Sequence, residues 1–70
     1  MQKWEYLPVQ IIMGAHYNSP NPYEVFSNHK RIFTRVTIQQ AWDYLNKLGQ
    51  DGWEMVNSDL SYFYFKRPVE

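Results

Sequence analysis

The fold is decided by residues 37–53, which read TIQQAWDYLNKLGQDGW. Thr37, followed three residues later by Gln40, matches the capping box that starts helices, so the chain predicts a helix beginning at Thr37. Apolar residues then recur at steps of three and four, which is typical of a helix with one buried face. They are Ile38, Ala41, Trp42, Leu45 and Leu48. Gly52 is placed to end the helix in a left-handed conformation and to turn the chain into a strand.

Strands are predicted on both sides of this helix. After it, residues 53–57 and 62–67 are predicted to form two strands joined by the polar turn Ser58 and Asp59, and Pro68 ends the second. Before it, residues 3–13 form one long strand, in which Pro8 lacks a donor and so indicates an edge position or a break.

The segment between the first strand and the helix is polar at its start, where Asn, Ser and Pro predict a loop. Residues 23–26 and 31–36 predict a second hairpin that turns at Ser27 and Asn28. The expected fold class is therefore α+β: one amphipathic helix packed on a small, mainly antiparallel sheet, in the order strand, loop or hairpin, helix, strand, strand. We expect residues 1–70 to form a single domain.

Size and composition point to self-association. A chain of 70 residues buries a marginal core, and small domains compensate with disulfides, a metal or oligomerisation. The chain has no cysteine, and neither His16 nor His29 has a carboxylate at ligand spacing, so no metal site and no cofactor are predicted. A homodimer or higher oligomer is the remaining option.

The aromatic run at residues 62–65 supports the same expectation. Alternation places Tyr62 and Tyr64 on one face of the sheet and Phe63 and Phe65 on the other. One helix covers one face, and the simplest cover for the other is a second copy packed sheet to sheet about a two-fold axis. In the alternative, the tyrosine hydroxyls lie in water and residues 14–35 fold over the rest.

Three segments resemble a known family. They are KWEY at residues 3–6, LNKLGQDGWEMV at 45–56 and FKRP at 65–68. In these the chain is similar to the small bacterial and phage family catalogued as domain of unknown function 4177. The resemblance implies a strand, helix, strand, strand fold and no established activity, and it leaves residues 14–36 uncovered.

The same segments have a simple physical interpretation. Four of their residues are expected in the core, Gly52 as the helix cap, and four others as surface ion-pair partners. Trp4, Leu45, Leu48 and Trp53 are the expected core residues, and Glu5, Glu54, Lys66 and Arg67 the expected ion-pair partners. Asp43 and Lys47 are expected to form an i, i+4 pair on the helix.

Enzyme signatures are missing from the sequence, which contains no nucleophile elbow, phosphate-binding loop or dinucleotide fingerprint. Ser27, His29 and Asp43 could form a triad only by coincidence, so we expect a non-enzyme without catalytic residues. The chain also lacks a long apolar run and a signal-peptide pattern, which predicts a cytoplasmic protein that does not bind membranes.

A ligand surface is predicted between residues 16 and 35, where aromatic and basic residues alternate. The expected binding residues are Tyr17, Tyr23, Lys30, Arg31, Phe33 and Arg35. Aromatic rings stack on nucleobases and guanidinium groups bind phosphate. On a regular strand Arg31, Phe33 and Arg35 would project to one face. The alternative is an ordinary hairpin whose basic residues protect an edge strand.

These features predict a non-enzymatic homo-oligomer that holds a small anionic aromatic ligand, such as a nucleotide or cyclic dinucleotide. In a phage, such a protein would need only binding to sequester a host defence signal. A second hypothesis is a protein-interaction module that uses the aromatic sheet face. Nucleic acid is disfavoured as a partner because the net charge is zero.

Overall fold

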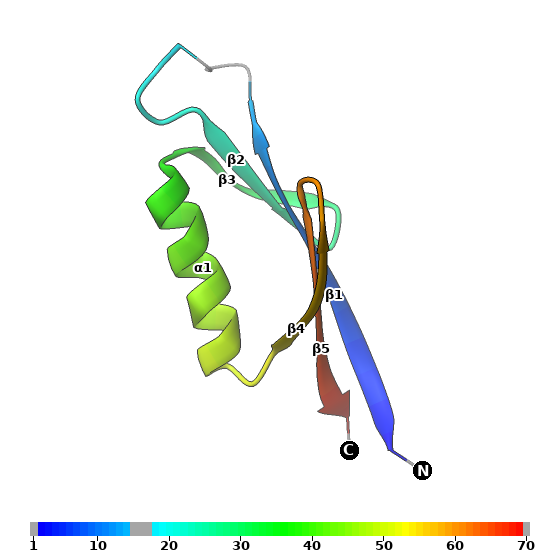
Figure 1. Cartoon of the computed structure of the whole chain (residues 1–70). Coiled ribbons are helices and arrows are strands. Elements are labelled where there is room, and N and C mark those ends of the chain that lie inside the picture. The colour runs from blue at the N-terminus through cyan, green and yellow to red at the C-terminus, as the bar shows by residue number, and fades with distance from the viewer. Residues whose placement is uncertain (1, 15–17, 70) are drawn as a thin grey trace.

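The computed structural model describes residues 2–14 and 18–69. The elements in chain order are β1 (Lys3–Met13), β2 (Tyr23–Ser27), β3 (Lys30–Val36), α1 (Ile38–Gln50), β4 (Glu54–Asp59) and β5 (Tyr62–Val69). The strands form one antiparallel sheet in the order β3-β2-β1-β5-β4, and α1 lies along one side of it (Figure 1). The predicted α+β class with one helix is confirmed.

The helix begins where the capping box predicts. The Thr37 side chain accepts a hydrogen bond from the Gln40 amide at 3.1 Å, and the Gln40 side chain accepts one from the Thr37 amide at 2.8 Å. Gly52 has a φ of +95° and, as predicted, carries the chain away from the helix. These local signals place α1 before any tertiary contact is considered.

One predicted pair on the helix is wrong. The Lys47 ammonium lies 3.9 Å from the carboxylate of Asp51, at the same i, i+4 spacing but one turn further on. Asp43 instead accepts a hydrogen bond from the Gln39 amide group at 2.9 Å. Asp43 and Asp51 are each four positions from Lys47, and the pair with Asp51 places the ammonium near the last carbonyl groups of the helix.

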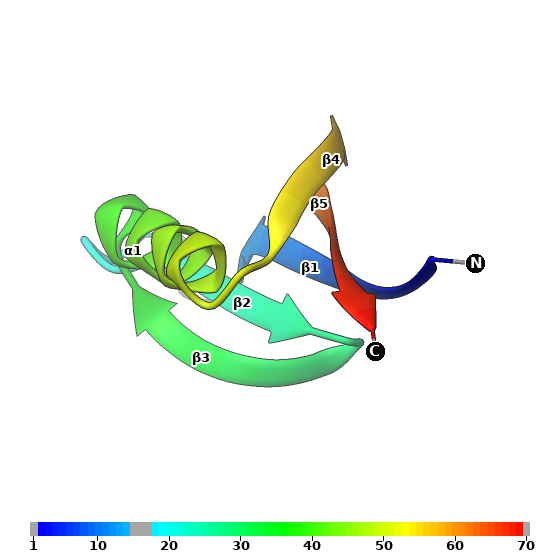
Figure 2. The same ribbon diagram turned by 90° about the horizontal axis from the view of Figure 1, so that it is seen from below.

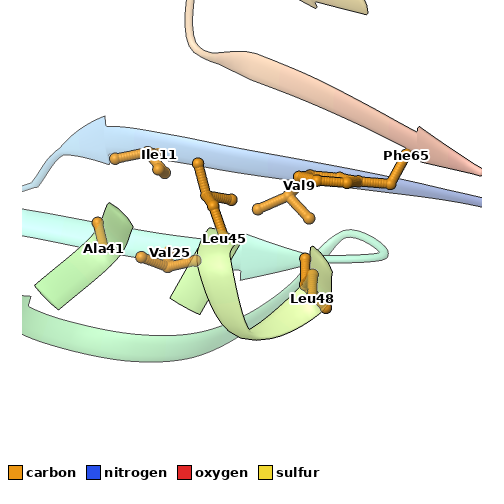
Figure 3. Close-up of a cluster of buried hydrophobic side chains, with 7 residues drawn as sticks. All are labelled: Val9, Ile11, Val25, Ala41, Leu45, Leu48 and Phe65. Carbon is orange, nitrogen blue, oxygen red and sulfur yellow. The ribbon is translucent and has the colours of Figure 1, made fainter. Parts of the chain in front are cut away.

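The core lies between α1 and the centre of the sheet. Its buried side chains are Val9, Ile11, Val25, Ala41, Leu45, Leu48 and Phe65 (Figure 3). Ile38 and Trp42, which the pattern places on the same helix stripe, are 45% and 42% exposed. The sheet curls around the helix, as Figure 2 shows, and Trp42 contacts Phe63 of β5 edge to face, with ring centroids 5.5 Å apart, so its ring is only partly covered.

Two tryptophans expected in the core differ in their outcome. Trp53 is half-buried and packs against the core, with the Arg67 guanidinium 4.3 Å from its ring centroid. Trp4 is 41% exposed, so its predicted core position is wrong. Alternation places it on the side of the sheet opposite to α1, because odd-numbered residues of β1 such as Val9 face the helix.

Pro8 does not mark an edge strand or a break, and that prediction is corrected. β1 is continuous and is the central strand of the sheet. The carbonyl of Pro8 accepts a hydrogen bond from the Asn28 amide at 2.9 Å, so the missing N–H points toward the turn after β2. The ladder between β1 and β2 starts only at Val9, and no ladder bond is lost.

Pro68 also lies within a strand, since β5 continues to Val69, and the prediction that it ends β5 is corrected. The carbonyl of Ser61 accepts a hydrogen bond from the Ile11 amide of β1. Backbone groups alternate in direction along an antiparallel strand, so odd-numbered residues of this segment face β1 and even-numbered residues, including Pro68, face the β4 side. Glu54, which pairs with Lys66, is the first residue of β4. Pro68 therefore lies beyond the start of its neighbour.

The second hairpin is confirmed, with its turn one residue later than expected. Ser27 pairs with Lys30, and the two turn residues, Asn28 and His29, have φ values of +53° and +68°. These angles match a type I′ turn, which favours Asn at its first position. The register between β2 and β3 then shifts twice, so β3 is a bulged edge strand.

Candidate binding surface

The face of the sheet opposite to α1 carries a row of aromatic side chains, and we call it the open face. It follows from the register, because the residues that pair with one another across β1 and β5 share a face. Its main members are Trp4, Tyr6, Pro8, Tyr62, Tyr64 and Lys66, with Phe26 and Arg31 from β2 and β3. The predicted separation of the two tyrosines from Phe63 and Phe65 is confirmed.

A hollow of about 560 Å³ lies on this face, where β1 and β5 pass the turn between β2 and β3. It is lined by Tyr6, Pro8, Tyr62 and Tyr64 of the open face, by His29 of the turn, and by Leu7 and Phe65, two residues that the register places on the helix side. The hollow exists because the turn between β2 and β3 ends beside Pro8. From Pro8 toward the N-terminus, β1 has a neighbouring strand only on the β5 side. Its volume is within the range of small-molecule sites.

The walls of the hollow are aromatic and accessible. The rings of Tyr62 and Tyr64 are parallel, with centroids 5.8 Å apart and an angle of 6° between their planes. Tyr6 is 67% exposed and Tyr64 is 36% exposed. Flat rings that are held in place and still reach solvent can stack on a planar ligand.

A lysine and a histidine lie close to these rings. Lys66 is opposite Tyr6 in the register, and its ammonium lies 4.1 Å from the centroid of the Trp4 ring. His29 contributes an imidazole from the turn. The neighbouring acid, Glu54, faces Lys66 from β4. The arrangement therefore combines ring faces with a cation fixed by a cation–π contact.

The predicted ligand residues do not gather into one site in a single copy of the chain. Tyr17 lies outside the described residues. Tyr23 is half-buried and packs on the helix side against the core. Lys30 is exposed beside the turn, and the Arg31 guanidinium lies 3.8 Å from the Glu24 carboxylate.

The prediction that Arg31, Phe33 and Arg35 share a face is wrong. Phe33 pairs with Val25 and Arg31 with Phe26, and these consecutive residues of β2 point to opposite faces. The extra residue in β3 breaks the alternation on which the prediction depends. Arg35 has a φ of +58° in a second irregularity.

Phe33 and Arg35 line two separate hollows. Phe33 contacts Tyr44 edge to face, with centroids 5.5 Å apart, in a groove of about 380 Å³ between β3 and α1. Arg35 borders a hollow of about 320 Å³ formed with Ser19, Pro20 and Asn21. The described members of the predicted set thus lie apart, at the core, beside the turn, on the open face and in two separate hollows.

Tyr6, Leu7 and Pro8 are the residues of the hollow that sequence reasoning missed. Tyr62 and Tyr64 were recognised as an aromatic face, but their partners across the sheet were not identified. The signal was present in the alternation of β1, where Trp4, Tyr6 and Pro8 share one parity. Only the pairing of β1 with β5 shows that this parity and that of Tyr64 form one surface.

The described part of the chain contains neither a metal-ligand cluster nor a helix that could span a membrane. Residues 2–14 and 18–69 contain no group of three or more His, Cys, Asp or Glu side chains placed to hold a metal ion. None of the helices formed by those residues is long and apolar enough to cross a membrane.

No protein-family model matches the chain, and no curated protein or solved structure matches it either. The resemblance to the domain of unknown function 4177 family therefore stays a prediction that rests on the three quoted segments.

Proposed function

We propose that the protein is a non-enzymatic, self-associating binding protein that holds a small ligand with an aromatic ring and negative charge. The observation that carries this proposal is the hollow on the open face, where Tyr6, Tyr62 and Tyr64 present their rings. The proposed site replaces the one predicted around Arg31 and Phe33, because those two side chains point to opposite faces.

A nucleotide suits the chemistry of this hollow. Stacking of a base on an aromatic ring contributes about 1–3 kcal/mol, and two parallel tyrosine rings 5.8 Å apart form a suitable platform. His29 lines the hollow and Lys66 pairs with Tyr6, another lining residue, so both side chains are candidates to bind phosphate oxygens. Sequestration of a nucleotide signal, including a cyclic dinucleotide, needs this binding and no further chemistry.

Self-association is supported by the exposure of large side chains on the open face. Trp4 and Tyr6 are 41% and 67% exposed. Burial of part of this apolar area against a second copy would favour association. In a symmetric assembly the hollow is present once per copy, which suits a ligand with its own two-fold symmetry.

The test is the melting temperature of the purified protein with mononucleotides, cyclic dinucleotides and short oligonucleotides. A ligand at one hundred times its Kd adds about 2.7 kcal/mol, which raises the melting temperature of a domain this small by roughly 10 °C or more. We expect at least one nucleotide of the panel to produce this shift. No shift with any member contradicts the nucleotide proposal.

Two variants locate the site. Tyr64→Ala removes one wall of the hollow, and we expect it to abolish the shift. Phe33→Ala removes a side chain that is similarly exposed, 42% against 36%, from the other groove, and should leave the shift intact. Loss of the shift in Phe33→Ala but not in Tyr64→Ala would place the ligand between β3 and α1 instead.

The exposed aromatic side chains also favour a second function, a protein-interaction module that docks a partner on the open face. This function predicts no response to nucleotides. It also predicts that Tyr6→Ala and Trp4→Ala weaken capture of a protein partner without changing the oligomeric mass.

A further inference from the structure

One segment of the central strand has a free edge. β1 pairs with β5 over Lys3–Gln10 but with β2 only over Val9–Met13. On the β2 side, residues 3–7 therefore have no neighbouring strand among the described residues, and in Figure 1 this half of β1 runs beside β5 alone. Such an edge presents unpaired backbone donors and acceptors.

The register identifies which backbone groups face outward. The Ile11 amide donates toward β5, to Ser61, and the Pro8 carbonyl accepts from the opposite side, from Asn28. Backbone groups alternate along an antiparallel strand, so residues of the same parity as Pro8 point away from β5. The N–H and C=O groups of Trp4 and Tyr6 are therefore presented at the free edge.

We propose that a second copy of the chain pairs antiparallel with this edge, with the two-fold axis at Trp4. Trp4 then pairs with the partner's Trp4, and Gln2 pairs with the partner's Tyr6. The two sheets become one continuous sheet. This inference rests on the self-association in the proposed function, and it places the interface at the edge of β1 in place of the sheet-to-sheet packing expected from the sequence.

The position of Pro8 selects this register. Trp4 and Tyr6 are the residues of β1 whose backbone groups are free at this edge, and pairing them with themselves or with each other places the axis at Trp4, Glu5 or Tyr6. An axis at Glu5 would place the partner's Gln2 beside Pro8, and an axis at Tyr6 would place the partner's Trp4 there. The Asn28 amide already occupies that place, 2.9 Å from the Pro8 carbonyl.

Charge complementarity supports the same register. With the axis at Trp4, Lys3 is directly opposite the partner's Glu5, and Glu5 is opposite the partner's Lys3. Opposite charges at directly paired positions stabilise a sheet. An axis at Glu5 would instead bring two copies of Glu5 together. Arg67, which forms an ion pair with Glu5, keeps this carboxylate on the helix side of the sheet.

The two outer edges of the sheet are poorer choices for symmetric pairing. β3 carries Lys30, Arg31 and Arg35 without an acid, and β4 carries Glu54 and Asp59 without a base. Pairing either strand with its own copy would bring like charges together. The edge of β1 carries one charge of each sign.

The pairing also agrees with a ligand in the hollow. It joins Trp4 to the partner's Trp4 on the open face, near the rim, and leaves the rings of Tyr62 and Tyr64 uncovered. The partner's Gln2 lies beside Tyr6, which lines the hollow. Each hollow is therefore next to the subunit boundary, and the two hollows are related by the axis.

The test exchanges the two charges and reads mass by light scattering. The wild type is expected at twice the chain mass of 8.5 kDa. In a Lys3→Glu dimer both facing pairs of positions 3 and 5 consist of two acids, and in a Glu5→Lys dimer both consist of two bases. Each variant alone should therefore dimerise at least tenfold more weakly than the wild type. An equimolar mixture of the two variants should form a heterodimer of wild-type affinity, because every facing pair is again of opposite sign.

Two controls separate edge pairing from general effects. Lys30→Glu makes the same charge change on β3, and Arg67→Ala removes the ion pair of Glu5 without changing the edge. Both should remain dimers. A monomeric wild type, a Lys3→Glu dimer of wild-type affinity, or a mixture that fails to pair would overturn the inference.

The ligand panel, run on the wild type, distinguishes failure of this inference from failure of the proposed function. Charge-dependent pairing without any nucleotide response would leave the interface standing and overturn the nucleotide ligand. A dimer that responds to nucleotides and is indifferent to the charges of Lys3 and Glu5 would overturn the interface alone.

Discussion

Replacing Leu45 with alanine should cost far more stability than replacing Ile38, although both belong to the same apolar stripe of α1. Leu45 is 4% exposed and Ile38 is 45% exposed. Leu45→Ala removes about 2.4 kcal/mol of transfer free energy, at about 0.8 kcal/mol per carbon. With the cavity that it leaves, the expected loss is about 3–4 kcal/mol.

Ile38→Ala removes the same number of carbons from a side chain that is about half in water. Its transfer loss is therefore about 1 kcal/mol, and the better helix propensity of alanine returns about 0.4 kcal/mol. The expected difference between the two variants is about 2–3 kcal/mol. It corresponds to a melting temperature lower by roughly 10–20 °C for Leu45→Ala.

Thermal and urea unfolding, followed by circular dichroism, measure both losses. The protein concentration must be the same in all samples, because self-association adds to the apparent stability. Equal losses for the two variants would refute the placement of α1 on the sheet, since only that placement makes the two positions differ.

Three further variants test local features by the same unfolding measurements. Thr37→Ala removes the cap of α1 and should cost about 1 kcal/mol, whereas Thr37→Ser should cost little. Gly52→Ala should cost about 1–2 kcal/mol of stability. The cost comes from the backbone, whose φ is +95°, because an added Cβ would meet no atom within 4 Å. An unchanged stability would contradict the left-handed turn. Arg35→Gly should stabilise by up to about 1 kcal/mol, because it relieves a φ of +58°, and it should leave nucleotide binding intact; a weaker nucleotide response would return this residue to the site.

Most of the fold could be predicted because its signals are local. The capping box, the helix period and the aromatic run are each contained within a few residues, and the structure confirms α1 and the last hairpin. The turn of that hairpin lies at Leu60 and Ser61, because the predicted turn residues Ser58 and Asp59 still pair with β5. The errors at Pro8 and Pro68 have one cause. A proline excludes a ladder bond only if a neighbouring strand lies on its N–H side, and the sequence does not show where neighbouring strands end.

The candidate site was predicted less well because it depends on register. Alternation from Arg31 to Arg35 assumed a regular strand, and two irregularities in β3 moved Phe33 to the helix side and Arg31 to the open face. The hollow joins Tyr6 to Tyr64 across fifty-eight positions of the chain. Such a pairing leaves no local signature.

The sequence by itself determined a helix that starts at Thr37, strands on both sides of it, and two chemically different faces on β5. These follow from steric and hydrogen-bonding preferences within one or two turns of chain. The tertiary structure decided that β1 is central, that its first residues keep a free edge, and that the aromatic residues of β1 and β5 form one surface. These features depend on which strands pair and where each pairing stops, and those choices are made by contacts between distant segments.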